Sequence, residues 1–221
     1  MALKIAPEGW PFVAVCTLSA LALAAVALVC AGVTGQIAAL LTLVLVALAF
    51  FMLYFFRDPE RATPDRPEAF ISPADGRIIV VEEVVESRYF HEPRRQISIF
   101  MSPVNVHVNR SPCAGTVVST RHNTGKHFAA YREGASLRNE NSEMVLETRY
   151  GRILVRQVAG FLARRTVCRV GPGAVLRQGE RFGIIKFSSR LDVYLPVGSV
   201  TQVVFGDRVR AGETILAVMK V

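Results

Sequence analysis

The pair Ser188-Ser189, in an apolar-flanked segment near the C-terminus, can in principle carry out an unusual reaction on its own backbone. A serine hydroxyl that attacks the carbonyl of the preceding residue turns the amide into an ester, and elimination then cuts the chain. The downstream piece is left with a pyruvoyl group at its N-terminus, an electrophilic ketone made from the protein itself. Serine pairs are common and most of them are solvated turns, so this pair needs support from other residues.

Two other segments contain side chains that could assist such a serine. Ser72-Pro73-Ala74-Asp75-Gly76 has the composition of a turn before a strand and carries a carboxylate. Residues 102–112 contain a single histidine, His107, in an apolar alternation, and histidine exchanges protons near neutral pH. In isolation the first segment is most often an ordinary turn, and a lone histidine of this kind is most often a packing residue.

The N-terminal part of the chain has the composition of a membrane anchor. No charged residue occurs between Glu8 and Arg57. Residues 11–34 and 36–56 each provide about the twenty apolar residues that cross a hydrocarbon core, and Gly32, Thr34, Gly35 and Gln36 form a short polar break between them. We expect residues 1–56 to form a hairpin of two transmembrane helices, with a single re-entrant hairpin as the alternative. A second apolar run directly after the first argues against a cleaved signal peptide.

The charge balance indicates where the remainder of the chain works. The sequence has 26 Lys and Arg against 18 Asp and Glu, a net charge of +8. Arg57 and Arg61 follow the second span, which by the positive-inside rule favours a cytoplasmic globular portion. A basic domain beside a bilayer is attracted to anionic headgroups, by about 1 kcal/mol for each nearby cation. No nucleic-acid recognition motif accompanies the charge, so membrane lipid is the expected partner and nucleic acid is not.

The cysteine and histidine positions do not predict a metal site. Cys16 and Cys30 lie in the apolar runs, Cys113 and Cys168 are far apart, and there is no CxxC pair. His122 and His127 have a spacing that does not place them on one helix face. We therefore expect no metal and no redox motif.

From Ile71 onward, short apolar runs rich in β-branched residues alternate with Gly and Pro, which predicts a mainly β domain. A helix is expected at most over residues 161–168. We expect strands over residues 77–85, 96–101, 115–120, 142–150, 152–158, 181–187, 191–196, 201–205 and 214–221.

An internal echo refines this class. Residues 173–180 and 206–213 share the pattern Gly-x-x-aliphatic-x-x-Gly-Glu, and each leads into an apolar strand. Glycines in such a turn supply positive φ angles. The pattern resembles the hairpins of biotinyl and lipoyl domains, so we expect a barrel-sandwich-hybrid-like domain. In those carriers the modified lysine precedes the hairpin, whereas Lys220 follows it, which disfavours a carrier function.

Three motifs taken in order resemble those of the phosphatidylserine decarboxylases, in their short bacterial and archaeal form. They are Ser-Pro-Ala-Asp-Gly at 72–76, Ser-Pro-x-Asn-Val-His-x-Asn-Arg-x-Pro at 102–112, and Arg-Phe-Gly-x-Ile-x-Phe-x-Ser-Arg-x-Asp-Val-Tyr-Leu-Pro at 181–196. The resemblance covers residues 57–221, and the membrane hairpin before them also fits the family.

The resemblance implies a carboxy-lyase that is made as a proenzyme. The domain 57–221 is expected to cleave itself between Ser188 and Ser189, giving chains 1–188 and 189–221 that stay together. Its cofactor would be the covalent pyruvoyl group derived from Ser189. Phosphatidylserine would form a Schiff base with this group, lose carbon dioxide and leave as phosphatidylethanolamine at the inner cell membrane. Whether the protein forms a homodimer is left open.

By matching motifs, the resemblance assigns catalytic roles to Ser189, His107 and Asp75. We hypothesise that Asp75 orients the imidazole of His107, which then deprotonates Ser189. Arg110 occupies the position at which longer family members have a second histidine. Either His107 therefore serves both processing and decarboxylation, or another group supplies the processing base. Arg110 and Arg190 are candidate anion contacts, although surface arginines usually only keep a face solvated.

Ser188 is a second departure, because most relatives have glycine before the reactive serine. We expect slower cleavage, unless Ser188 is an engineered change that traps the precursor. Two other functions remain open. One is a catalytically silent, membrane-anchored β-domain that binds anionic lipid or a protein partner. The other is the same chemistry on a soluble amino acid, which the apolar hairpin argues against.

Overall fold

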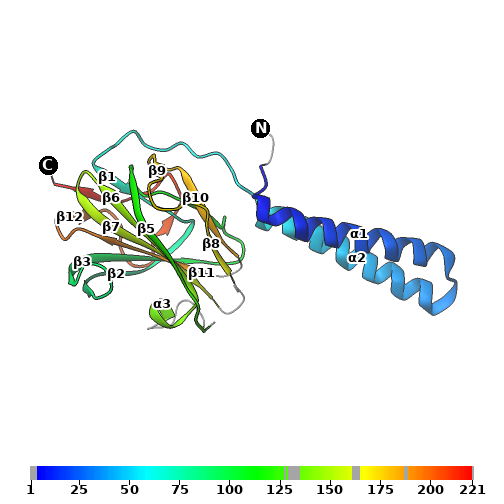
Figure 1. Ribbon diagram of the computed structural model, residues 1–221. Helices are drawn as coiled ribbons and strands as arrows, with labels where there is room; N and C mark the ends of the chain where they lie inside the picture. Colours follow the sequence, from blue (N-terminus) through cyan, green and yellow to red (C-terminus); the bar gives the residue numbers. More distant parts are fainter. Residues whose placement is uncertain (1–3, 127, 129–134, 161–164, 187–188, 221) are drawn as a thin grey trace. The chain divides into compact units, whose positions relative to one another are not determined.

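The structure is a computed structural model that describes the chain except for residues 1–3, 127, 129–134, 161–164, 187–188 and 221 (Figure 1). The chain divides into two compact units, Met1–Pro59 and Glu60–Val221. The first is helical and the second is mainly β, which confirms the predicted fold class.

The first unit is a helical hairpin. A short 3-10 helix, η1 (Pro7–Gly9), leads into α1 (Trp10–Val29), and α2 (Gly32–Phe55) runs back along it. Spans Pro7–Val29 and Gly32–Phe55 have mean hydropathies of 2.6 and 2.7 and are long enough to cross a bilayer. The expected break around residues 32–36 is wrong, because α2 already begins at Gly32 and only two residues separate the helices.

The two ends of the hairpin lie side by side. The Lys4 carbonyl accepts a hydrogen bond of 2.7 Å from the backbone N–H of Asp58. The Phe56 ring stacks on Phe12 with ring centroids 5.5 Å apart, and it covers Gly9, where an added Cβ would lie 2.5 Å from the Phe56 Cβ. The chain therefore enters and leaves this unit at one end, as a two-span hairpin requires.

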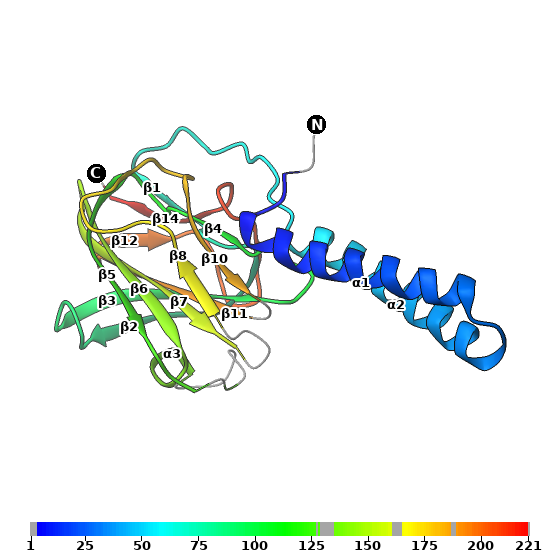
Figure 2. The same ribbon diagram turned by 45° about the vertical axis from the view of Figure 1, so that its right-hand side comes forward.

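The second unit is built from three antiparallel sheets (Figures 1 and 2). The large sheet has eight strands in the order β13-β2-β3-β11-β7-β6-β5-β9, and the small sheets are β1-β14-β12 and β4-β10-β8. The large-sheet strands are β2 (Gly76–Glu86), β3 (Glu92–Met101), β5 (Gly115–Asn123), β6 (Asn141–Thr148), β7 (Gly151–Ala159), β9 (Val175–Leu176), β11 (Ser189–Leu195) and β13 (Arg208–Val209). The others are β1 (Ala69–Ile71), β4 (Val108–Arg110), β8 (Arg165–Cys168), β10 (Arg181–Lys186), β12 (Ser199–Thr201) and β14 (Ile215–Met219), with the short helix α3 (Ala135–Arg138) before β6.

The strand β11 lies at the centre of the large sheet and separates two environments. It bonds to β3 on one side and to β7 on the other. Leu191 and Val193 point into the main apolar core, whereas Arg190 and Asp192 point to the opposite face, where they are buried in polar contacts. This alternation is the two-residue period of a strand whose two faces are both covered.

Most predicted strands are confirmed to within a few residues, and two predictions are wrong. Residues 202–204 after β12 are irregular and lead into a turn at residues 205–206, and Val204 and Phe205 are exposed. The expected helix over 161–168 is wrong for the described part, because Arg165–Cys168 is the strand β8. The strands that the sequence did not reveal are two to four residues long, too short to show a period.

The internal echo is confirmed and proves longer than its glycine pattern. All four glycines that open and close the two turns have positive φ, between 78° and 94°. The turn 206–213 pairs with the segment 72–76, where Gly212 N–H donates to the Ser72 carbonyl. The turn 173–180 pairs in the same way with 111–115, where Gly179 N–H donates to the Ser111 carbonyl. We call these the Asp75 copy and the Cys113 copy.

The two copies match down to single hydrogen bonds. Ser72 Oγ donates to the Ala74 carbonyl and Ser111 Oγ to the Cys113 carbonyl, both at 2.7 Å. Each copy supplies one edge of the large sheet, through β13 beside β2 and through β9 beside β5. The copies also bond to one another reciprocally, from Ile71 N–H to the Pro112 carbonyl and from Arg110 N–H to the Pro73 carbonyl. The fold is thus an internal pseudo-two-fold duplication.

Candidate active site

Ser189 is the first residue of β11 and is fully buried. It lies opposite Met101 of β3 and Ala159 of β7, and its Oγ is 3.3 Å from the Met101 Sδ. The hydroxyl therefore sits on the core side of the sheet. Ser188, the other half of the predicted cleavage site, lies outside the described residues.

Two amide side chains that the sequence did not single out support this position. Asn109 Nδ2 lies 3.9 Å from the same Met101 Sδ, and Asn109 Oδ1 accepts a 2.8 Å hydrogen bond from Gln157 Nε2. Both amides are buried. Asn109 is part of the motif at 102–112, so the motif was the available signal. For Gln157 the only signal was a polar residue inside an apolar strand, which is a weaker signal.

His107 is fully buried and its ring orientation is defined by a backbone group. Nδ1 lies 2.9 Å from the Asn105 carbonyl oxygen. A carbonyl only accepts hydrogen bonds, so Nδ1 carries the proton and Nε2 of the neutral ring keeps its lone pair. The His107 carbonyl in turn accepts from the N–H of Ile185, four residues before Ser189 in the chain. The histidine is therefore in the tautomer that a base acting through Nε2 requires.

Asp75 has different partners from those expected. Its carboxylate accepts hydrogen bonds of 3.0 and 2.8 Å from Arg61 Nη2, and one of 2.8 Å from the backbone N–H of Ala211. The contact that orients Nδ1 of His107 comes from Asn105 instead. Asp75 therefore holds the turn at Ala211 and the segment at Arg61 in place.

The two arginines considered as anion contacts are occupied within the protein. Arg110 is buried and Nη1 donates to the Gly179 carbonyl at 3.0 Å. Arg190 is also buried and donates to Asp192 at 2.6 Å and to Ser98 Oγ at 2.9 Å. Both tie strands and turns of the fold together.

The buried face around Asp192 is a larger ion cluster. Arg156 is fully buried, pairs with Glu143 at 2.8 Å and donates to the Tyr194 hydroxyl at 2.8 Å. Burial would raise the pKa of Glu143, but the Arg156 charge and hydrogen bonds from Tyr89, Arg156 and Asn123 outweigh it and hold this pKa below its usual range. Burial and the Asp192 charge raise the pKa of Tyr194 to about 12.

A cavity of about 560 Å³ opens beside Asp75. It borders two of the site residues, since Asp75 lines it directly and Asn105, whose carbonyl holds His107, lines it as well. Within the described residues, no group of three or more His, Cys, Asp or Glu side chains is arranged to bind a metal. The lining residues are Asp75, Gly76, Arg77, Phe100, Ser102, Val104, Asn105, Arg208, Val209 and Arg210.

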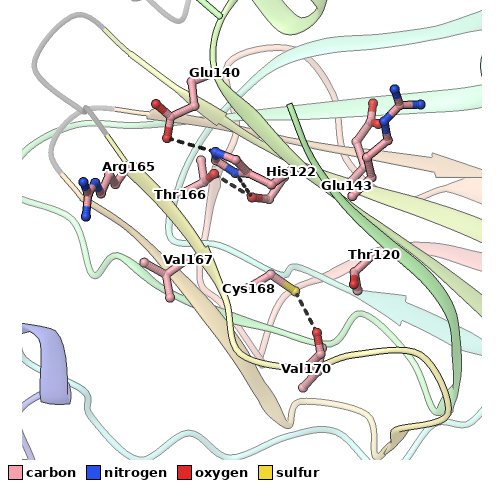
Figure 3. Close-up of a pocket in the computed structure, with 11 residues that line it drawn as sticks. Thr120, His122, Glu140, Glu143, Arg165, Thr166, Val167, Cys168 and Val170 are labelled. Carbon is pink, nitrogen blue, oxygen red and sulfur yellow. Dashed lines mark hydrogen bonds and ion pairs between the residues drawn. The ribbon is translucent and has the colours of Figure 1, made fainter. Parts of the chain in front are cut away.

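A second polar cavity, of about 640 Å³, lies between β5, β6 and β8 (Figure 3). His122 Nε2 lies 3.8 Å from the Glu140 carboxylate and Nδ1 lies 3.1 Å from Ser142 Oγ, which also contacts Thr166. Figure 3 shows the Cys168 thiol turned to the Val170 carbonyl, and burial raises the pKa of this thiol.

Asn139, directly before β6, binds the backbone of β7 at the residue that faces Ser189. Its Nδ2 donates to the carbonyl of Ala159, the residue directly opposite Ser189, at 2.7 Å. The same amide donates to the Phe128 carbonyl and its Oδ1 accepts from the Phe128 N–H. Asn139 therefore holds the backbone directly beside Ser189 in place.

A family model described as phosphatidylserine decarboxylase matches residues 48–217. The chain is 47% identical over 178 residues to the phosphatidylserine decarboxylase proenzyme of Desulfotalea psychrophila, covering 80% of this chain and 83% of that protein. It is 43% identical over 216 residues to the proenzyme of that name from Geobacter sulfurreducens, covering 97% and 96% of the two chains.

The similarity to the proenzyme of the same name from Aromatoleum aromaticum is of the same order, with 44% identity over 214 residues and coverage of 96% and 94%. The matched region contains both turn copies, Ser189 and His107. This extent of similarity to several such proteins, together with the family match, shows that the chain belongs to the phosphatidylserine decarboxylase family.

Proposed function

We propose that this protein decarboxylates phosphatidylserine to phosphatidylethanolamine with a pyruvoyl group that it makes from Ser189. The observation that carries the proposal is the position of Ser189 in a chain of this family. It is buried at the start of a central strand, and the His107 carbonyl accepts a hydrogen bond from the N–H of Ile185, four residues before Ser189 in the chain. The decarboxylation consumes one proton and releases carbon dioxide.

The self-cleavage that we propose uses only the chain's own atoms and water. The Ser189 hydroxyl, deprotonated by His107, attacks the carbonyl carbon of Ser188, and the C–N bond breaks to leave an ester and a free amine. Elimination across Cα and Cβ of Ser189 releases Ser188 as a carboxylate and leaves a dehydroalanine. Water then replaces the nitrogen, which leaves as ammonia, and the new terminus is a pyruvoyl group.

The surroundings of Ser189 fit such a group. Met101, Leu191 and Ala159 are fully buried and give the site apolar walls. The amides of Asn109 and Gln157 provide hydrogen-bond donors near it. When formed, the group supplies a carbonyl that takes up a primary amine and withdraws electrons as carbon dioxide leaves.

The sheet supports the expectation that the two fragments stay together. β11 is hydrogen-bonded along its whole length to β3 and over nearly all of it to β7, so a cut before Ser189 leaves its ladder intact. The fragment 189–221 also contributes β13 to the edge of the large sheet and β14 to the centre of a small one. Separation would expose the core residues Leu191, Val193 and Leu216, which makes dissociation unfavourable.

We further propose that the helical hairpin anchors the enzyme in the inner membrane with the β-unit on the cytoplasmic side. The hairpin exposes most of its apolar side chains, including Leu18 at 66% and Leu28 at 88%, as lipid-facing helices do. Arg57 and Arg61 after the second helix agree with the positive-inside rule. A membrane lipid is then the substrate within reach.

The test is intact-mass spectrometry of the full-length protein in detergent, with an assay of carbon dioxide and phosphatidylethanolamine. We expect two fragments that co-purify, the smaller one beginning with a pyruvoyl group at position 189. Ser189→Ala is expected to give one uncut chain with no activity. A fully active protein that retains the peptide bond between Ser188 and Ser189 would refute the mechanism. A correctly folded, uncut and inactive protein would favour a silent lipid-binding domain instead.

A further inference from the structure

We propose that Arg77, Arg208 and Arg210 form a cradle for the phosphodiester of an anionic glycerophospholipid headgroup, in the cavity beside Asp75. This inference rests on the proposed function, because it assigns a part of the same substrate to residues that nothing above uses. All three arginines line that cavity, and all three are exposed.

The first support comes from strand register. Arg77 of β2 lies directly opposite Arg208 of β13. Directly opposed residues of an antiparallel pair point to the same face, and like charges in such a pair destabilise the sheet. Within the described part of the chain, neither arginine makes an ion pair with an acidic side chain. The pair is therefore unfavourable by itself and is compensated when an anion lies between the two guanidinium groups.

Arg210 extends the cradle along the same edge. It follows Arg208 by two residues, directly after β13, and lines the same cavity. Its contact with Glu213 is long, at 3.8 Å, and its side chain is 74% exposed, so this pair holds it only weakly. Three arginines therefore line one cavity with little compensation from acidic side chains, and guanidinium is the side-chain group that matches phosphate oxygens in a bidentate manner.

The position of the cavity connects the cradle to the chemistry. Asp75 and Asn105 form part of its wall, and the Asn105 carbonyl orients His107. Phe100 and Ser102 line it as well; Phe100 lies opposite Arg77 in the β2–β3 ladder and, by strand alternation, on the other face of the sheet from Met101 and the Ser189 hydroxyl. In a phosphoserine headgroup only a few bonds separate the phosphodiester from the amine, so a headgroup anchored here must pass around the end of β3, past Asn105, to bring its amino acid part to the reacting residues.

The second, independent support is the internal duplication. In the Cys113 copy, the positions that correspond to Arg77 and Arg208 are Thr116 and Val175, which are also directly opposite each other. The counterpart of Asp75 is Ala114. The same turn and edge strand therefore form without these charges, so the fold does not require them. Arg210 does have a counterpart, Arg177, which supplies a matched control.

The experiment compares Arg77→Gln, Arg208→Gln, their double variant and Arg210→Gln with Arg177→Gln, the counterpart of Arg210, all in the full-length protein in detergent. Cleavage is checked by mass spectrometry, and KM and kcat are measured with a short-chain, water-soluble phosphatidylserine. We expect the single variants to raise KM about tenfold and the double variant more, since each loses charge-assisted hydrogen bonds to phosphate. We expect kcat within about twofold of the unmodified protein, and Arg177→Gln to leave KM unchanged.

Arg208→Lys, which keeps the charge but loses the planar fork, is expected to recover only part of the affinity. Equal KM values for the double variant and Arg177→Gln would overturn the inference. So would a fall in kcat at unchanged KM, because that result would place the arginines in catalysis.

A binding measurement separates this inference from the proposed function. Uncleaved Ser189→Ala protein is titrated calorimetrically with a short-chain phosphatidylglycerol and with inorganic phosphate. We expect the lipid analogue to bind more tightly than phosphate and to lose its affinity in the double arginine variant. Phosphate binding as tightly as the lipid would overturn the assignment to a lipid headgroup. An inactive natural protein that still shows arginine-dependent lipid binding would reject the decarboxylase activity and retain the cradle.

Discussion

The Asp75 copy and the Cys113 copy are two versions of one turn within one chain. Both have a serine whose hydroxyl donates to the carbonyl two residues on, and both bond that serine's carbonyl to a glycine in the left-handed region. Only the Asp75 copy carries a carboxylate, which binds Arg61, and an opposed pair of arginines at the sheet edge. The shared residues are those that the turn requires. The residues that differ are the ones on which chemistry depends.

The largest expected contrast is between Asp75→Ala and Ala114→Asp, which exchange the two copies at one position. Asp75→Ala leaves the Arg61 guanidinium, only 10% exposed, without its main acceptor and removes the partner of the Ala211 N–H. We expect a loss of about 3 kcal/mol in the free energy of unfolding, measured by urea denaturation in detergent. Ala114 is exposed, so Ala114→Asp is expected to change it by less than about 0.5 kcal/mol.

Asp75→Asn keeps an acceptor for both donors and serves as the milder control. A loss of stability for Ala114→Asp as large as that for Asp75→Ala would show that the two turns respond alike and that Asp75 has no special structural role.

The second contrast depends on pH and concerns Cys113, whose counterpart is Ala74. Burial raises the pKa of the Cys113 thiol to about 12 from an ordinary value of 9.0. The unfolded chain therefore ionises this thiol first, so its contribution to stability falls as pH rises from about 9 to about 12. At pH 10 the unmodified protein is expected to have lost on the order of 1 kcal/mol of stability through this thiol, relative to pH 7.

Cys113→Ala makes the second copy resemble the first and is expected to remove this part of the pH dependence. The measurement is the difference between the unmodified protein and the variant at pH 7 and at pH 10. A difference that does not change with pH would contradict the assignment.

A smaller effect is expected for the serines, where the copies should agree. Ser72→Ala and Ser111→Ala each remove one buried hydrogen bond of 2.7 Å to a backbone carbonyl. We expect each to cost about 1 kcal/mol in the free energy of unfolding. Values that differ by more than about 1 kcal/mol would show that the two turns do not share one energetic design.

The smallest effect on stability is expected at the sheet edges. Arg208→Gln and Arg177→Gln each remove an exposed charge, and both should leave the melting temperature nearly unchanged, with stability within about 0.5 kcal/mol. Arg208→Gln relieves the repulsion from Arg77, so we expect it to raise the free energy of unfolding slightly. Strong destabilisation by Arg208→Gln would mean that Arg208 supports the fold and not a ligand.

Much of this organisation could be predicted from local patterns. The apolar runs before Arg57 predicted a helical hairpin, and the β-branched runs predicted most long strands, because the periods of 3.6 and 2 are properties of the sequence. The hairpin break was misplaced because glycine and threonine also occur inside apolar helices. The motif that includes His107 and Asn109 marked the site, but it did not identify Gln157, whose role depends on a strand distant in sequence.

The sequence by itself determined the class of fold, the family and the identity of Ser189, His107 and Asp75 as candidates, since these are carried by residue type and order. Only the tertiary structure decided which groups meet. In the fold Asp75 pairs with Arg61, the His107 imidazole contacts the Asn105 carbonyl, and Arg77 lies opposite Arg208. Such pairings depend on strand register and on contacts between residues far apart in the chain, where a shift of one residue turns a side chain to the other face.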